Sequence, residues 1–168
     1  GRIIFYFTST IPMVMFPLVV KRFTKGEDYK GLFYLSIALV LLPSLGITLF
    51  YFLFPTFVLA IVVSGKYNTI AQYLWLMGLY LSIFSVINVY INFFLSLKRT
   101  YIMYPTGLAA ILQIILIALF HENFYHILYS SITASIVLLS ALIFLSQKIF
   151  TKKQSLLREL PIQGEPPL

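Results

Sequence analysis

The sequence predicts an all-α membrane protein, a polytopic transmembrane helix bundle of about five spans. Two observations concern composition: 60% of the 168 residues are hydrophobic and only 10% are charged, whereas about 25% of the residues in a soluble domain are charged. The third observation is the pattern. The apolar residues form uncharged runs of about 18 residues or more, each long enough as a helix to cross ~30 Å of hydrocarbon.

The apolar runs divide the chain into five expected spans and a tail. These spans cover residues of about 3–20, 31–54, 70–97, 101–120 and 126–146. The run from Gly31 to Val63 is longer than one crossing needs. We expect Pro43 and Pro55 to divide it, with residues 31–54 as the crossing and residues 55–64 as its kinked or interfacial continuation. Residues 147–168 are expected to form a basic cytoplasmic tail that is disordered at its end.

The distribution of cations predicts the direction of the spans. Ten of the twelve Lys and Arg residues lie in alternate connections and in the tail, and only Arg2 and Lys66 lie on the other side. The ten are Lys21, Arg22, Lys25, Lys30, Lys98, Arg99, Lys148, Lys152, Lys153 and Arg158. Because cytoplasmic loops are enriched in Lys and Arg, we expect the C-terminus to be cytoplasmic and residue 1 to lie outside. Cations in such positions also contact anionic lipid headgroups.

The sequence contains few groups suited to covalent chemistry, and we expect no enzymatic activity. It has no cysteine, and its five carboxylates all lie in expected loops or in the tail. His121 and His126 are five residues apart, whereas two zinc ligands on one helix face are four apart. We therefore expect no metal site and no cofactor. The net charge of +7 lies at the ends of apolar runs rather than on a polar face, which argues against nucleic-acid binding.

Polar and small residues follow one face of the third expected span. They are Gly78, Ser82, Ser85, Asn88, Asn92 and Ser96. On a helix these positions fall within an arc of about 120°. Because asparagine is costly in hydrocarbon, this face should contact other helices or a watery cavity. Two interpretations stay open, namely hydrogen bonding between helices and the lining of a hydrophilic path.

Six residues are the candidates for such a substrate path. Three of them, Ser85, Asn88 and Asn92, come from this face. The weaker candidates are Gln113 in the fourth span and Thr8 and Pro12 in the first. A proline within a span removes a backbone donor and bends or ends the helix. Kinked helices beside polar faces favour a transporter over a simple membrane anchor.

A series of short segments resembles a known family in order and spacing. The segments are Ile11-Pro12, Phe16-Pro17, Lys25-Gly26, Phe54-Pro55, Ser64-Gly65-Lys66-Tyr67 and Leu97-Lys98-Arg99. From about residue 3 to residue 146, the chain resembles the C-terminal lobe of the polysaccharide and oligosaccharide-lipid flippases. These belong to the multidrug/oligosaccharidyl-lipid/polysaccharide exporter superfamily. Its members typically have twelve helices in two lobes with both termini cytoplasmic, and the direction derived from the charges fits the last five.

The resemblance implies a transporter that works by alternating access. Two lobes rock around a central cavity and carry an undecaprenyl-diphosphate-linked oligosaccharide across the cytoplasmic (inner) membrane for surface polysaccharide biosynthesis. It also implies that the first lobe, and the first helix of the second, precede this chain. The expected partners are the lipid-linked oligosaccharide, membrane lipids and that missing N-terminal lobe.

Other functions remain as alternatives to the flippase. They are a multidrug exporter of the same superfamily, a membrane-embedded glycan polymerase or ligase, and a noncatalytic membrane subunit. Multidrug exporters generally couple transport to cations through acidic residues in membrane helices, and the five expected spans contain none. A polymerase would need catalytic groups facing outward, and His121, Glu122 and His126 lie in a short loop. The sugar-lipid branch is therefore favoured.

Overall fold

The computed structural model describes residues 13–22, 24–25, 28, 30–63 and 68–159, and all regular structure within these ranges is helical. The elements in chain order are α2 (Lys30–Leu53), α3 (Pro55–Val63), η1 (Asn68–Tyr73), α4 (Leu74–Ser96), η2 (Thr100–Ile102), α5 (Met103–Leu119) and α6 (Phe124–Glu159). Residues 13–22 form a further helix before α2. The predicted all-α class is confirmed for this part of the chain.

Four segments of the described chain are long and apolar enough to cross a membrane. They are Lys30–Leu53, Ala71–Ser96, Thr100–Leu119 and Phe124–Thr151. These segments coincide with the second to fifth predicted spans, so the chain is a membrane-embedded helical protein. Of the first predicted span, residues 13–20 are helical, and the earlier residues lie outside the described ranges.

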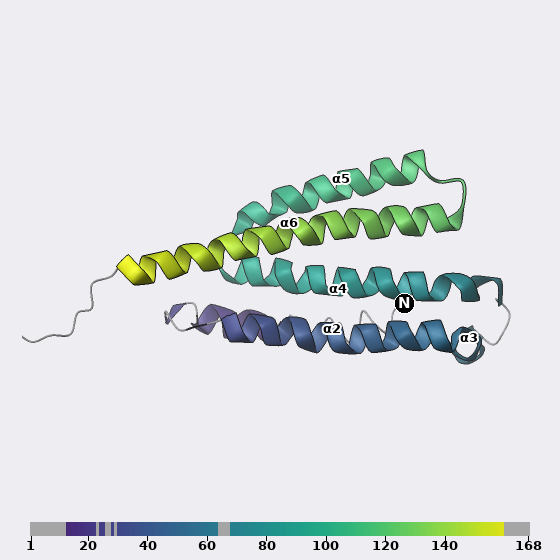
Figure 1. Ribbon diagram of the computed structural model, residues 1–168, viewed down its shortest axis with the longest axis horizontal. Helices are drawn as coiled ribbons and strands as arrows, with labels where there is room; N and C mark the ends of the chain where they lie inside the picture. Colours follow the sequence, from purple (N-terminus) through teal and green to yellow (C-terminus); the bar gives the residue numbers. More distant parts are fainter. Residues whose placement is uncertain (1–12, 23, 26–27, 29, 64–67, 160–168) are drawn as a thin grey trace, which may run out of the picture.

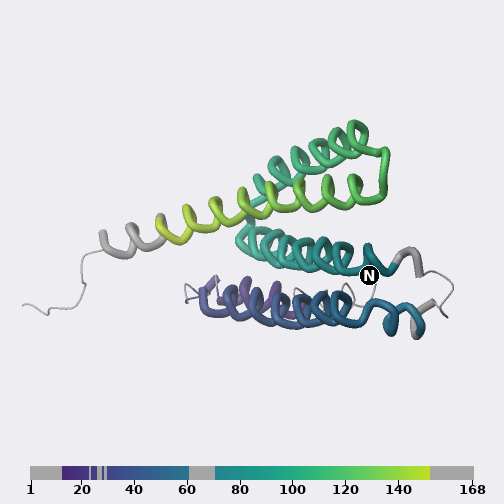
Figure 2. Tube along the Cα trace, turned by 45° about the vertical axis from the view of Figure 1, so that its right-hand side comes forward, coloured from purple at the N-terminus to yellow at the C-terminus, as the bar shows by residue number. Residues whose placement is uncertain are grey.

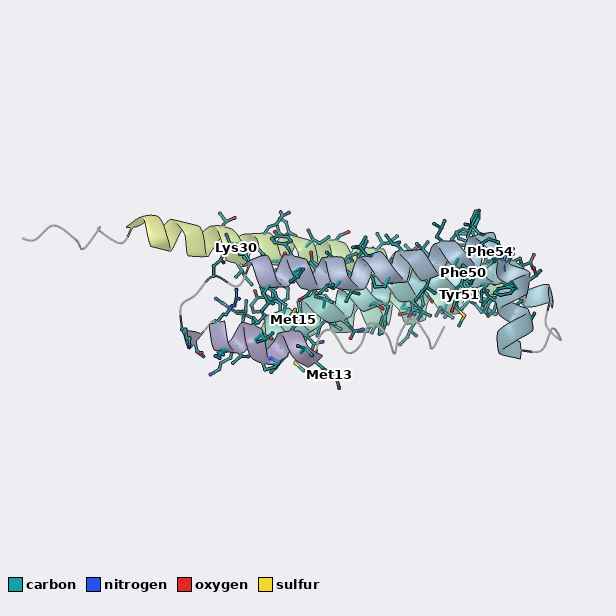
Figure 3. The ribbon with its side chains drawn as sticks, turned by 90° about the horizontal axis from the view of Figure 1, so that it is seen from below. Met13, Met15, Lys30, Phe50, Tyr51 and Phe54 are labelled. Atoms are coloured by element: carbon teal, nitrogen blue, oxygen red, sulfur yellow. The ribbon has the colours of Figure 1, made fainter. Side chains whose placement is uncertain are left out.

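Of the two prolines expected to divide the long apolar run, Pro55 does so and Pro43 does not. The long apolar run divides at Pro55, which is the first residue of α3, where its missing backbone N–H removes no helical hydrogen bond. At this point the chain turns away from the axis of α2 (Figure 3). Pro105 lies in the first turn of α5 for the same reason. Pro43 lies inside α2, and the helix continues through it.

The membrane helices form a row rather than a closed bundle. The main contacts join α2 to α4, α4 to α6, and α6 to α5. In Figures 1 and 2 the helices accordingly lie in the order α2, α4, α6, α5. Helix α4 is central and has twelve buried residues, whereas α5 lies at one edge with Ala109 as its one buried residue. The apolar side chains of α5 therefore face lipid or further helices.

The helix at residues 13–22 packs on the same core as α2 and α4. Met15 and Val19 are 2% and 0% exposed and belong to the buried cluster that contains Phe33 and Phe93. Met13 is 77% exposed on the opposite side of this helix, as Figure 3 shows. The described part of the first predicted span is thus held by its apolar face.

An aromatic cluster joins three helices at one end of the row. The ring centroid of Phe33 in α2 lies 4.0 Å from that of Phe93 in α4, and 5.9 Å from that of Phe150 in α6. The rings of Phe33 and Tyr90 meet edge to face at 5.1 Å. Such aromatic pairs are each worth about 0.5–1.5 kcal/mol beyond the area that they bury. The cluster therefore fixes α2, α4 and α6 to one another.

Helix α6 is longer than the predicted fifth span, which ended at residue 146. It continues to Glu159 and projects past the other helices (Figure 1). The first reason is that Phe150 is buried in the aromatic cluster, so packing extends beyond the predicted boundary. The second is that residues 147–159 are mostly good helix formers and contain neither Gly nor Pro. The first part of the predicted tail is consequently helical.

Cations gather at one end of the row, which we call the basic end. Its described members are Lys21, Arg22, Lys25, Lys30, Lys98, Arg99 and Lys148. The loop before α2, the α4–α5 turn and the last part of α6 all lie at this end (Figure 1). The described residues at the opposite end, in ranges 46–63, 68–82 and 112–132, include no Lys or Arg. The charge asymmetry in the sequence therefore corresponds to the two ends of the described structure.

Candidate functional site

The polar face predicted on the third span lies on α4, and we call it the polar stripe. It consists of Gly78, Ser82, Ser85, Asn88, Asn92 and Ser96. The glycine and the three serines are buried, whereas Asn88 and Asn92 are half-buried. The structure therefore divides the stripe into a part enclosed by neighbouring helices and a part with remaining exposed surface.

The first two residues of the stripe, Gly78 and Ser82, form a contact between α4 and α2. The hydroxyl oxygens of Ser82 and Thr48 lie 2.9 Å apart in a buried hydrogen bond between the two helices. A Cβ atom built on Gly78 would lie 3.0 Å from Thr48 Oγ1 and 3.2 Å from Tyr51 Cδ2. Only glycine permits this approach without displacing a neighbour. This part of the stripe is explained by helix packing.

The two asparagines donate hydrogen bonds to their own helix. Asn88 Nδ2 donates to the carbonyl oxygen of Phe84 at 3.1 Å, and Asn92 Nδ2 donates to that of Asn88 at 2.8 Å. Each carboxamide also carries an oxygen with two lone pairs. Since both side chains are half-buried rather than enclosed, their oxygens are suited to accept a hydrogen bond from a hydroxyl group.

The serines of the stripe also donate within α4. Ser85 Oγ donates to the carbonyl oxygen of Leu81 at 2.8 Å, and Ser96 Oγ donates to that of Asn92 at 2.7 Å. This bonding to the residue four positions earlier lets a hydroxyl lie in an apolar environment at low cost. Of the predicted path candidates, Ser85, Asn88 and Asn92 thus share one face, and the two asparagines keep the more accessible polar groups.

Gln113 occupies a different interface from the stripe. Its Nε2 donates to Ser131 Oγ at 3.2 Å, which links α5 to α6. Ser131 Oγ in turn donates to the carbonyl oxygen of Ile127. The structure therefore gives Gln113 a role in helix packing. The two remaining candidates, Thr8 and Pro12, lie outside the described residues.

Sequence reasoning missed Thr48 as the partner of Ser82. The signal was present in α2, because Ser36, Ser44 and Thr48 are separated from one another by multiples of four residues and are all buried. Small polar residues at this spacing indicate a face on which two membrane helices approach closely. The face of α2 thus carries the same kind of signal as the polar stripe of α4.

The described membrane helices carry neutral polar groups that can form hydrogen bonds. The described residues contain no group of three or more His, Cys, Asp or Glu residues that could hold a metal ion. The described stretches 31–54, 74–97 and 103–119 contain no ionisable carboxylate, amine, guanidinium or imidazole. Neutral amide and hydroxyl groups form hydrogen bonds but do not relay protons across a membrane.

Comparison with models of protein families, with curated proteins and with solved structures finds no significant match to this chain.

Proposed function

We propose that this chain forms the last five helices of a flippase for undecaprenyl-diphosphate-linked oligosaccharides. In this proposal it works with an N-terminal lobe in the cytoplasmic membrane and supplies surface polysaccharide biosynthesis. The two lobes expose a central path alternately to each side of the membrane. The basic end faces the cytoplasm, because cytoplasmic segments carry the excess of Lys and Arg. The C-terminus is then also cytoplasmic.

The observation that carries the proposal is the exposed part of the polar stripe. Asn88 and Asn92 are half-buried in the central helix of the row, although lipid-facing asparagine is costly. Each amide nitrogen donates one hydrogen bond within the helix, and each carboxamide oxygen is a hydrogen-bond acceptor. Sugar hydroxyls donate hydrogen bonds to such oxygens. Weak neutral contacts of this kind bind a polar substrate and also release it.

The absence of charge in the path agrees with this substrate class. No carboxylate lies within the described membrane helices between residues 31 and 119. A cation-coupled drug exporter generally uses such a carboxylate. The diphosphate of the lipid carrier would, in this proposal, be neutralised by cations of the N-terminal lobe.

The test introduces charge at the stripe and measures export. We expect Asn88→Asp and Asn92→Asp to abolish surface polysaccharide export in the producing cell while the amount of protein in the membrane stays the same. A carboxylate at a half-buried membrane site either stays charged at a high desolvation cost or takes up a proton, and both outcomes alter a sugar path. Asn123→Asp makes the same change in the exposed α5–α6 loop and should leave export intact.

Two results would contradict the proposal. Normal export by both stripe variants would show that the asparagines serve packing alone. Loss of drug resistance in cells lacking the protein, with surface polysaccharide intact, would instead identify a multidrug exporter.

A further inference from the structure

The basic end contains more positive charge than its carboxylates neutralise. Asp28 is the only carboxylate at this end among the described residues up to 151. Its Oδ1 accepts a hydrogen bond from the backbone N–H of Lys30 at 3.0 Å, so it stabilises the start of α2. Arg22 donates to the backbone carbonyl of Asp28 rather than to its carboxylate. Among the described side chains, the seven cations of the basic end therefore outnumber the single carboxylate.

Two cations of the basic end lie over aromatic rings of α6. The ammonium of Lys30 lies 5.3 Å from the ring centroid of Phe150, which links the start of α2 to α6, and that of Lys148 lies 4.6 Å from the ring centroid of Phe144. Phe150 contacts Phe93, one helical turn before the turn that contains Lys98 and Arg99. The aromatic cluster thus joins the start of α2, the last turns of α4 and α6, the three segments next to these cations.

The backbone of Lys98 supplies an independent observation. Helix α4 ends with the N–H of Arg99 bonded to the carbonyl of Phe94 and the N–H of Lys98 bonded to that of Leu95, a Schellman motif. The residue at the left-handed position of this motif is usually glycine. Here it is Lys98, with φ of 55°. Lys98 therefore carries an exposed charge at a backbone position that glycine adopts at lower cost.

The position of the basic end relative to the bilayer suggests what binds there. Helix α6 has 36 residues and is about 54 Å long, which exceeds ~30 Å of hydrocarbon. The uncharged apolar run of α6 ends at Ser146, close to Lys148 and to Phe150 of the aromatic cluster. The cations of the basic end therefore lie at the level of the lipid headgroups, where phosphates are concentrated.

We propose that the basic end binds anionic phospholipid headgroups, with Lys30, Lys98, Arg99 and Lys148 as the contacting cations. The phosphate groups provide counter-charge for the cations in excess of Asp28 among the described side chains. They also join α2, the α4–α5 turn and α6 from the membrane surface. This inference does not depend on the flippase proposal.

The experiment measures lipid binding to the purified full chain by native mass spectrometry. Phosphatidylglycerol and phosphatidylcholine are titrated separately. We expect preferential binding of phosphatidylglycerol, and about fivefold weaker binding for each cation removed in Lys30→Gln, Lys98→Gln and Arg99→Gln. Lys66→Gln is the matched control, because it removes one cation in the connection between α3 and η1, outside the basic end.

The Lys98→Gly variant distinguishes the role of the charge in lipid binding from the effect of the residue on stability. This variant relieves the left-handed backbone, so its thermal unfolding temperature should rise while its binding of phosphatidylglycerol falls about fivefold. A residue with a merely structural role would change both quantities in the same direction. Equal binding of the two lipids, equal loss in Lys66→Gln, or displacement of phosphatidylglycerol by excess inorganic phosphate would each overturn the proposal.

Discussion

The close approach of α2 and α4 at Gly78 yields the sharpest prediction of stability. A Cβ at this position meets Thr48 Oγ1 at 3.0 Å and Thr48 Cγ2 at 3.3 Å. Thr48 has little freedom to move, because its hydroxyl also bonds to the carbonyl of Ser44 at 2.8 Å and to Ser82. Gly78→Ala should therefore push α2 and α4 apart by a few tenths of an ångström.

The expected loss of stability follows from three contributions. Overpacking a well-packed contact costs about 1–3 kcal/mol. Loss of the hydrogen bond between Thr48 and Ser82 costs about 0.6 kcal/mol, the average for such bonds in a membrane protein. The alanine gains about 1 kcal/mol in helix propensity. We expect Gly78→Ala to lower the free energy of unfolding by about 0.6–2.6 kcal/mol, and Gly78→Val to lower it further because its side chain is larger and β-branched.

The assay is reversible unfolding by SDS in mixed micelles, followed by tryptophan fluorescence. Trp75 is the one tryptophan of the chain, and its ring lies 6.1 Å from that of Phe52, so it reports on the contact between α4 and α2. The control is Gly46→Ala in α2, where a Cβ meets nothing within 4 Å and the variant should be as stable as the parent or more stable. Equal stability of Gly78→Ala and Gly46→Ala would refute the close approach.

Three further predictions concern other contacts. A double-mutant cycle with Gln113→Leu and Ser131→Ala should give a coupling free energy of about 0.6 kcal/mol in the same unfolding assay. A coupling free energy of zero would contradict the hydrogen bond between α5 and α6. Phe150→Ala should cost about 3 kcal/mol because Phe150 is 8% exposed, whereas Phe144→Ala, with 57% exposure, should change stability by about 0.5 kcal/mol or less. Lys98→Gly should raise the unfolding free energy by about 1 kcal/mol, since glycine adopts a positive φ without strain.

The sequence alone was sufficient for the positions of the membrane helices. Hydropathy predicted the second to fifth spans, and the structure contains apolar helices at these positions. Proline chemistry indicated the break at Pro55. Cations in alternate connections predicted that they lie on one side, and Lys21, Lys98 and Lys148 lie at one end of the row. These features follow from local properties, because each depends on a short stretch of chain and on the thickness of a bilayer.

The roles of individual polar residues required the tertiary structure. A helical period showed that Ser82, Asn88 and Asn92 share a face, but only the packing of α2 showed that Ser82 bonds to Thr48 while the asparagines stay half-buried. Gln113 was a path candidate from sequence, and the neighbouring α6 instead supplies Ser131 as its partner. Which polar groups meet depends on how the helices are placed in space.

The extent of α6 and the order of the row were likewise decided by packing. Sequence placed the end of the last span at residue 146, and burial of Phe150 against Phe33 and Phe93 extends the packed helix. The order α2, α4, α6, α5 was not predicted. The physical reason is that lipid tails are as apolar as a protein core, so hydropathy identifies a membrane helix without distinguishing its lipid-facing side from its protein-facing side.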